Sequence, residues 1–226
     1  MNEENIPQSF KMNYNLHSPW SDILFETTLP PMILEKMIEL SDEVLADSKR
    51  ISWGKNLAGQ IKEELQLESK LLKKENLLDF FSNMIQEYIH QCNLQQALPG
   101  QHQHVEAVKN HIQVVINSMW IVEQQPGEYN PIHTHTGCDI SSVMYLKAPN
   151  FLPSEKTERD DDGTIYFIGS SSPKTKLNTN SLKVKPMPGQ FFIFPSHLQH
   201  TVYPYKTNDN FARRSVSFNA SFEYKE

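Results

Sequence analysis

The sequence predicts an α+β protein in which helices come first and a sandwich or barrel of antiparallel strands follows. Two stretches in the first 100 residues carry apolar side chains at helical spacing. After Gly100 the chain changes to short runs of β-branched and aromatic residues, separated by connections rich in Pro, Ser and Asp. No internal repeat or low-complexity linker is visible, so a single domain over residues 1–226 is the economical prediction.

The bulk composition fits an ordinary globular protein. The 226 residues are 38% hydrophobic and 21% charged, with a formal net charge of -6. This charge disfavours a nucleic-acid partner, because phosphate binding needs a basic surface. No apolar run reaches the roughly 20 residues that span a bilayer, and the N-terminus lacks the features of a signal peptide. With only Cys92 and Cys138, the expected compartment is the cytoplasm; the oligomeric state stays open.

The first hundred residues predict two helices that pack on a sheet and carry no chemistry. Residues 1–20 are polar and are expected to drape over the surface or to begin an edge strand. Pro30-Pro31 predicts the start of the first helix, and residues 51–69 are predicted to be irregular. A second helix is predicted from one apolar stripe, which ends near residues 98–100. The stripe consists of Leu77, Leu78, Phe81, Met84, Ile85, Tyr88 and Ile89.

Strand character recurs through the rest of the chain. The predicted strands cover residues 114–116, 119–122, 141–146, 164–168, 182–184, 191–194 and 214–222. The acidic run within residues 148–163 and the polar residues 169–181 are expected to be solvated loops.

Most of the nine histidines need no special role. Surface positions or satisfied core positions are the ordinary interpretation for His17, His90, His102, His104 and His111. The pair His102 and His104 has i, i+2 spacing, but it lies in a polar stretch that predicts a loop.

His133 and His135 differ because they precede a predicted strand. Residues i and i+2 of an extended chain point to the same face, roughly 6.5–7 Å apart. Their imidazoles can then converge on one ion at about 2.0–2.2 Å, and His200 is placed to supply a third nitrogen. Spacing alone leaves open an iron site, a zinc site and unliganded surface histidines.

Four motifs around these histidines decide between the alternatives. They are NPIHTHTG (130–137), SSVMYL (141–146), PGQFFIFPS (188–196) followed by His200, and RRSVSFN (213–219). Together, in this order, they resemble the 2-oxoglutarate/Fe(II)-dependent oxygenases. The nearest likeness is to a largely uncharacterised bacterial and phage subgroup related to the prolyl hydroxylases. The motif-bearing part runs from about residue 120 to 222.

The resemblance implies a double-stranded β-helix of the jelly-roll or cupin-like kind over residues 101–226, with helical support from residues 1–100 on the major sheet. It also implies Fe(II) held by His133, His135 and His200. His135 stands where the superfamily usually has a carboxylate, and three neutral imidazoles leave the ferrous charge less compensated. The alternative is a carboxylate from Asp139, roughly 13 Å past His135 on an extended strand, which requires a sharp turn.

The resemblance further implies 2-oxoglutarate as co-substrate, with Tyr145, Arg213 and Ser215 around its distal carboxylate. A guanidinium satisfies a buried carboxylate with two parallel hydrogen bonds. Strand alternation puts Arg213 and Ser215 on one face and Arg214 on the other. The alternative is that Arg213 lies on a strand with its side chain facing solvent and binds no co-substrate.

The implied reaction couples decarboxylation of 2-oxoglutarate, with O2, to oxidation of a C–H bond, and releases succinate and CO2. The substrate is unknown; a prolyl or other peptidyl residue is the suggestion that comes with the resemblance. Residues 150–162 and the N-terminal region are candidates for recognising it. Two other functions stay open: a cupin-like three-histidine dioxygenase that does not use 2-oxoglutarate, and a non-catalytic β-domain without metal.

Overall fold

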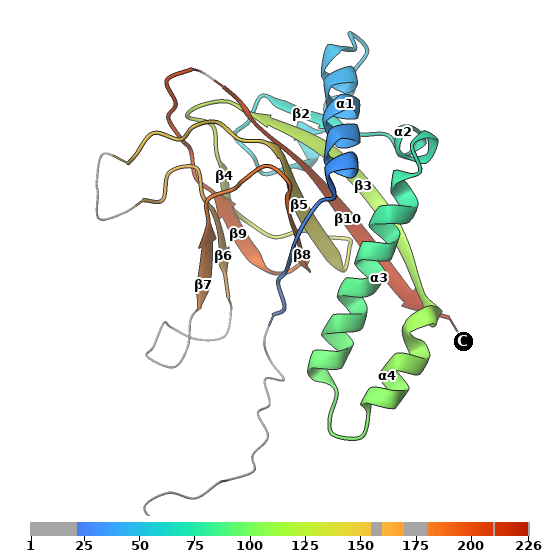
Figure 1. Ribbon diagram of the computed structural model, residues 1–226. Helices are drawn as coiled ribbons and strands as arrows, with labels where there is room; N and C mark the ends of the chain where they lie inside the picture. The colour runs from blue at the N-terminus through green and yellow to red at the C-terminus, as the bar shows by residue number, and fades with distance from the viewer. Residues whose placement is uncertain (1–21, 155–159, 170–179, 210, 226) are drawn as a thin grey trace, which may run out of the picture.

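Two antiparallel sheets face each other, and helices cover the outer side of the larger one (Figure 1). The computed structural model describes residues 22–154, 160–169, 180–209 and 211–225. The predicted edge strand within residues 1–20 lies outside these ranges. The order of the strands is β1-β8-β5-β10-β3-β2 in the large sheet and β4-β9-β6-β7 in the small one.

The strands of the large sheet are β1 (Phe25–Thr28), β2 (Glu63–Gln66), β3 (Ile112–Gln124), β5 (Ile140–Lys147), β8 (Gln190–Pro195) and β10 (Arg213–Tyr224). Those of the small sheet are β4 (Asn130–His133), β6 (Ile165–Ile168), β7 (Ser181–Val184) and β9 (Gln199–Val202). The helices are α1 (Pro31–Ala46), α2 (Ser69–Lys74), α3 (Leu77–Gln96) and α4 (His102–Val108), with short 3-10 turns at Gly54–Asn56 and Lys109–His111.

The large sheet is buried on both sides, which explains why β5 reads as an almost continuous apolar run. Successive side chains of a strand point to opposite faces. Met144 and Leu146 therefore pack in the core under the helices, whereas Val143 and Tyr145 pack in a second core between the sheets.

Aromatic packing fastens α3 to the large sheet. Phe81 is fully buried, and its ring lies 6.0 Å from the ring of Phe191 on β8 and 5.9 Å from that of Phe218 on β10. Such offset pairs add about 0.5–1.5 kcal/mol each beyond the area that they bury. The α+β class and the packing of the N-terminal helices on the large sheet are confirmed.

Local patterns predicted some elements wrongly. Residues 102–104 lie in helix α4 and not in a loop. Residues 51–69, predicted to be irregular, include strand β2, and strands β1, β4 and β9 were not predicted. These four strands have only four residues each, so their formation depends on pairing with distant strands more than on local propensity. No helix in the described ranges is long and apolar enough to cross a membrane.

Candidate active site

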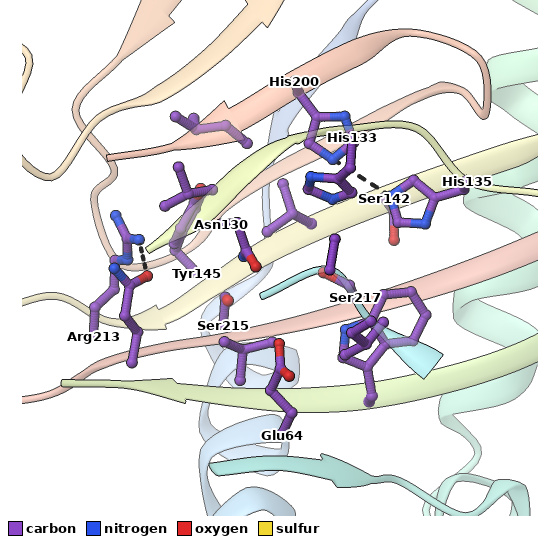
Figure 2. A pocket seen from close by; sticks show the side chains of 18 residues that line it. Glu64, Asn130, His133, His135, Ser142, Tyr145, His200, Arg213, Ser215 and Ser217 are labelled. Carbon is purple, nitrogen blue, oxygen red and sulfur yellow. Dashed lines mark hydrogen bonds between the residues drawn. The ribbon is translucent and has the colours of Figure 1, made fainter. Parts of the chain in front are cut away.

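The three predicted metal-binding histidines come together at one end of the space between the sheets. His133 ends β4 and pairs directly with His200 of β9. His135 lies two residues beyond β4, where its backbone N–H donates to the carbonyl of Ser196 at 2.9 Å. One ring nitrogen from each histidine lies within 4.8 Å of the others, which is the arrangement expected of a single-ion site (Figure 2).

Backbone carbonyls set the orientation of two of the rings. Nδ1 of His133 lies 2.8 Å from the carbonyl of Pro131, and Nδ1 of His200 lies 2.9 Å from that of Leu198. A carbonyl only accepts hydrogen bonds, so each Nδ1 carries the proton and Nε2 is left with its lone pair. Carbonyl partners of this kind typically orient metal-binding histidines.

Burial keeps the three imidazoles neutral. It lowers the pKa of His133, and it lowers the pKa of His135 to about 4 and that of His200 to about 3. The charge of His133 lowers the pKa of both of the other rings further. Because only the unprotonated imidazole binds a metal ion, the cluster is in its binding form at neutral pH.

Asp139, the alternative ligand, lies outside this cluster. Its carboxylate accepts the backbone N–H of Phe222 at 3.2 Å, and its own N–H donates to the carbonyl of Ala220 at 3.0 Å. These bonds hold Asp139 at the start of β5 beside β10. The geometry therefore favours His135 for the third position.

Arg213 occupies the other end of the same pocket. It is only 2% exposed, and it donates to the carbonyl of Gly163 at 2.6 Å and to the side-chain oxygen of Gln124. The rings of Tyr145 and Tyr205 lie 5.8 and 5.7 Å from its guanidinium carbon. No carboxylate among the described residues pairs with it, although Arg is almost never buried without an anion.

The hydroxyl of Tyr145 is likewise unsatisfied. Its oxygen is buried and has no hydrogen-bond partner among the described residues, and burial raises its pKa to about 12. A buried polar group without a partner costs about 1–3 kcal/mol. Ser215 pairs with Tyr145 in the sheet and lines the same pocket. An unpaired guanidinium and an orphaned hydroxyl in one pocket fit the distal carboxylate of 2-oxoglutarate.

Arg214 points the opposite way, as alternation predicts. Its guanidinium binds Glu123 at 2.5 Å, Ser41 at 3.0 Å and the carboxylate of Asp42. It therefore joins helix α1 to the outer face of the large sheet.

Five polar residues of the pocket were missed by reasoning from sequence: Glu64, Gln124, Asn130, Ser142 and Ser217. Asn130 stands in the first motif but received no role there. The alternation of Leu65 and Leu67 with Glu64 and Gln66 is the signal that could have revealed β2. Residues 155–159 of the loop predicted to recognise the substrate lie outside the described ranges. Gly163 follows directly after that loop, and its carbonyl accepts a hydrogen bond from Arg213.

The comparisons with known proteins agree with this geometry. Residues 118–219 match the family model described as "Putative 2OG-Fe(II) oxygenase". The core of the chain is therefore related to the 2OG-Fe(II) oxygenases. The recognition predicted from the sequence motifs is confirmed, and enzymes of this family use Fe(II), 2-oxoglutarate and O2. No curated protein matches the chain in sequence.

Solved structures share the fold at low sequence identity. A prolyl hydroxylase from Trichoplax adhaerens, in complex with a peptide fragment of the oxygen degradation domain of hypoxia inducible factor, matches with a TM-score of 0.55 and 12% identity over 88% of this chain and 83% of that one. The non-haem α-ketoglutarate-dependent epimerase SnoN from nogalamycin biosynthesis matches with a TM-score of 0.51 and 10% identity, over 91% and 79%. AviO1 from Streptomyces viridochromogenes Tue57 matches with a TM-score of 0.50 and 11% identity, over 89% and 90%. The predicted double-stranded β-helix is confirmed.

Proposed function

We propose that the protein is an Fe(II)- and 2-oxoglutarate-dependent dioxygenase that hydroxylates a C–H bond of a second substrate and releases succinate and CO2. One observation carries the proposal: a cluster of three neutral imidazoles lines the same pocket as a buried arginine that has no carboxylate partner among the described residues. The first can hold a metal ion and the second an organic anion.

His133, His135 and His200 would hold the iron through nitrogens that burial keeps unprotonated. Three protein ligands leave coordination positions for the keto-acid end of the co-substrate and for O2. Bound iron, with the keto acid, supplies the oxidising power that breaks the C–H bond. The protein binds and orients both substrates and excludes water, so no acid or base residue is required.

Arg213 would bind the distal carboxylate of 2-oxoglutarate, with the hydroxyl of Tyr145 as a second donor and Ser215 beside them. The bonds to Gly163 and Gln124 fix the guanidinium before any ligand arrives and use two of its five N–H donors. Charge-assisted hydrogen bonds to a carboxylate are roughly twice as strong as neutral ones. This end of the pocket is therefore preorganised for an anion.

The two other functions account for less of the site. A three-histidine dioxygenase that does not use 2-oxoglutarate would leave Arg213 and Tyr145 buried without a ligand. A non-catalytic β-domain would have no use for three imidazoles, one buried and two half-buried, with converging nitrogens. A peptidyl residue is the substrate class that we favour, although a shared fold does not fix a substrate. Cys92 and Cys138 are both free thiols, which fits the cytoplasm as the proposed location.

Anaerobic titration with Fe(II) and 2-oxoglutarate tests the proposal. The wild-type protein should develop a weak visible charge-transfer band, and His133→Ala and His200→Ala should abolish it. His197→Ala is the matched control, because His197 is exposed and contacts Asp22 instead of the cluster. Absence of the band in folded wild-type protein would refute the use of 2-oxoglutarate.

A second titration tests the anchor. Removal of one partner of a buried charge pair costs about 2–5 kcal/mol, so Arg213→Met should raise the 2-oxoglutarate concentration that gives half of the band by about 30-fold or more. Equal affinity in Arg213→Met and wild type would show that another residue binds the carboxylate.

A further inference from the structure

Glu64 places a buried carboxyl in the pocket at a point that the proposed reaction does not use. It is 2% exposed and lies on β2, where it pairs with Val122 of β3, another residue that lines the pocket. Its neighbours on the strand point the other way: Leu65 packs under the helices, and Glu63 forms an exposed ion pair with Arg50 at 3.4 Å. Pairing with β3 therefore fixes the inward direction of Glu64.

The carboxyl of Glu64 lacks the partners that a buried acid normally has. Its Oε1 is buried and has no hydrogen-bond partner within the described ranges, and no lysine or arginine there forms an ion pair with it. Burial, and secondly the charge of Glu128, raise its pKa to about 7. Arg213, the only arginine in the pocket lining, is bound to Gly163 and Gln124 at the far end (Figure 2).

A second acceptor lies beside it. A methyl group added to Gly59 would overlap both Oε1 of Glu64 and the side-chain oxygen of Asn130, so the two oxygens lie close together against this glycine. Asn130 is on β4, three residues before His133, and Figure 2 shows its amide and the Glu64 carboxyl pointing toward the same space. An N–H donor placed between these two oxygens would satisfy both of them.

We propose that Glu64, with Asn130 beside it, binds a nitrogen-borne hydrogen-bond donor of the primary substrate, either an ammonium group or an amide N–H. This inference rests on the proposed function, because it assumes that the substrate enters this pocket. An acceptor pair on the wall between Arg213 and the histidines leaves the anion site to the co-substrate. It also limits the substrate to molecules with an N–H group near the carbon that is oxidised, as in peptides and amines.

The test uses the full chain without metal and three small probes. They are n-butylammonium, N-methylacetamide, which has one N–H, and N,N-dimethylacetamide, which has none. Binding is followed by NMR through the carboxyl carbons of ¹³C-labelled glutamate. We expect at least one of the two N–H probes to shift the Glu64 signal, and dimethylacetamide to leave it unchanged.

Variants then separate the two kinds of donor. Glu64→Leu should weaken binding of the active probe at least tenfold, judged from ligand-observed NMR. Glu64→Gln keeps an acceptor but loses the charge, so it should weaken only the ammonium probe. Glu63→Gln is the matched control, because it makes the same change on the outward face of β2. Gly59→Ala is a second test, since its methyl group would displace both acceptor oxygens.

The inference is overturned if neither N–H probe binds wild type, if dimethylacetamide binds as well as N-methylacetamide, or if Glu64→Leu binds as tightly as wild type. These titrations need no iron. A missing charge-transfer band in wild type would refute the proposed function alone, whereas a normal band with no probe binding would refute only the role of Glu64.

Discussion

The Glu64 carboxyl makes a contribution to the stability of the metal-free protein that is lost as the pH rises. Its pKa increases from the ordinary 4.5 to about 7, mainly through burial and secondly through the charge of Glu128. In the unfolded chain the same carboxyl titrates near its ordinary value. Between these two pKa values the folded state holds a proton on Glu64 that the unfolded state has lost, so the contribution of Glu64 to the free energy of unfolding falls as the pH rises.

The size of the effect follows from the shift. Each unit of pKa corresponds to about 1.4 kcal/mol, so complete titration of Glu64 costs the folded state about 3 kcal/mol. A typical domain is stabilised by about 5–15 kcal/mol, so the loss is large enough to measure. Below a pH of about 4.5 the buried Glu64 does not destabilise the folded state through its ionisation, and well above about 7 it does so by the full amount of about 3 kcal/mol.

Comparison with Glu64→Gln isolates this contribution. The variant keeps the shape of the side chain and removes its titration, while His133, His135, His200 and the other titrating groups remain in both proteins. Urea denaturation in the presence of a chelator should show the variant gaining up to about 3 kcal/mol over wild type as the pH rises through the window from about 4.5 to above 7. A difference that is constant with pH would refute the reasoning, because it would mean that the buried carboxyl titrates like an exposed one. Glu63→Gln should show no such trend.

Three further variants test separate parts of the structure. Tyr145→Phe removes a hydroxyl without a protein partner, so stability to urea should not fall, but 2-oxoglutarate should bind about tenfold more weakly in the band titration; unchanged affinity would remove the hydroxyl from the anchor. Asp139→Asn should retain wild-type iron content in metal analysis, because the carboxylate binds the N–H of Phe222; loss of iron would revive Asp139 as a ligand. Arg214→Met leaves Glu123 without its guanidinium partner and should cost about 3–5 kcal/mol in urea denaturation; a cost below about 1 kcal/mol would contradict the importance of this bridge.

The residues predicted for the co-substrate end of the site lie on long strands with a clear local pattern. Tyr145 stands in an apolar run whose two faces are both buried, and Arg213 and Ser215 alternate with Arg214 on β10. In such strands the period of two assigns each side chain to a face, so a motif residue can be placed before the fold is known. That is why these three side chains could be assigned to one face before the fold was known.

The wall between the two ends of the pocket was not predictable, because it depends on pairing between distant segments. Glu64 faces the pocket because β2 pairs with β3, and the local sequence of β2 does not show which strand it pairs with. Asn130 and His133 lie on β4, which exists because His133 pairs with His200 on β9. In each case tertiary contacts override a polar local sequence.

The charges of the pocket explain why it contains one free carboxyl. In the proposed site His135 stands where a carboxylate is usual, so the three imidazoles would contribute no negative charge to the metal. The two charges of Fe(II) would then be matched by the two of 2-oxoglutarate, and the cation left over would be Arg213. Glu64 is the only acidic side chain in the described lining of the pocket, and in its ionised form it balances that cation without touching the co-substrate. A carboxyl on the wall of the pocket, and not on the metal, would remain available to the substrate through the buried oxygen that has no partner among the described residues.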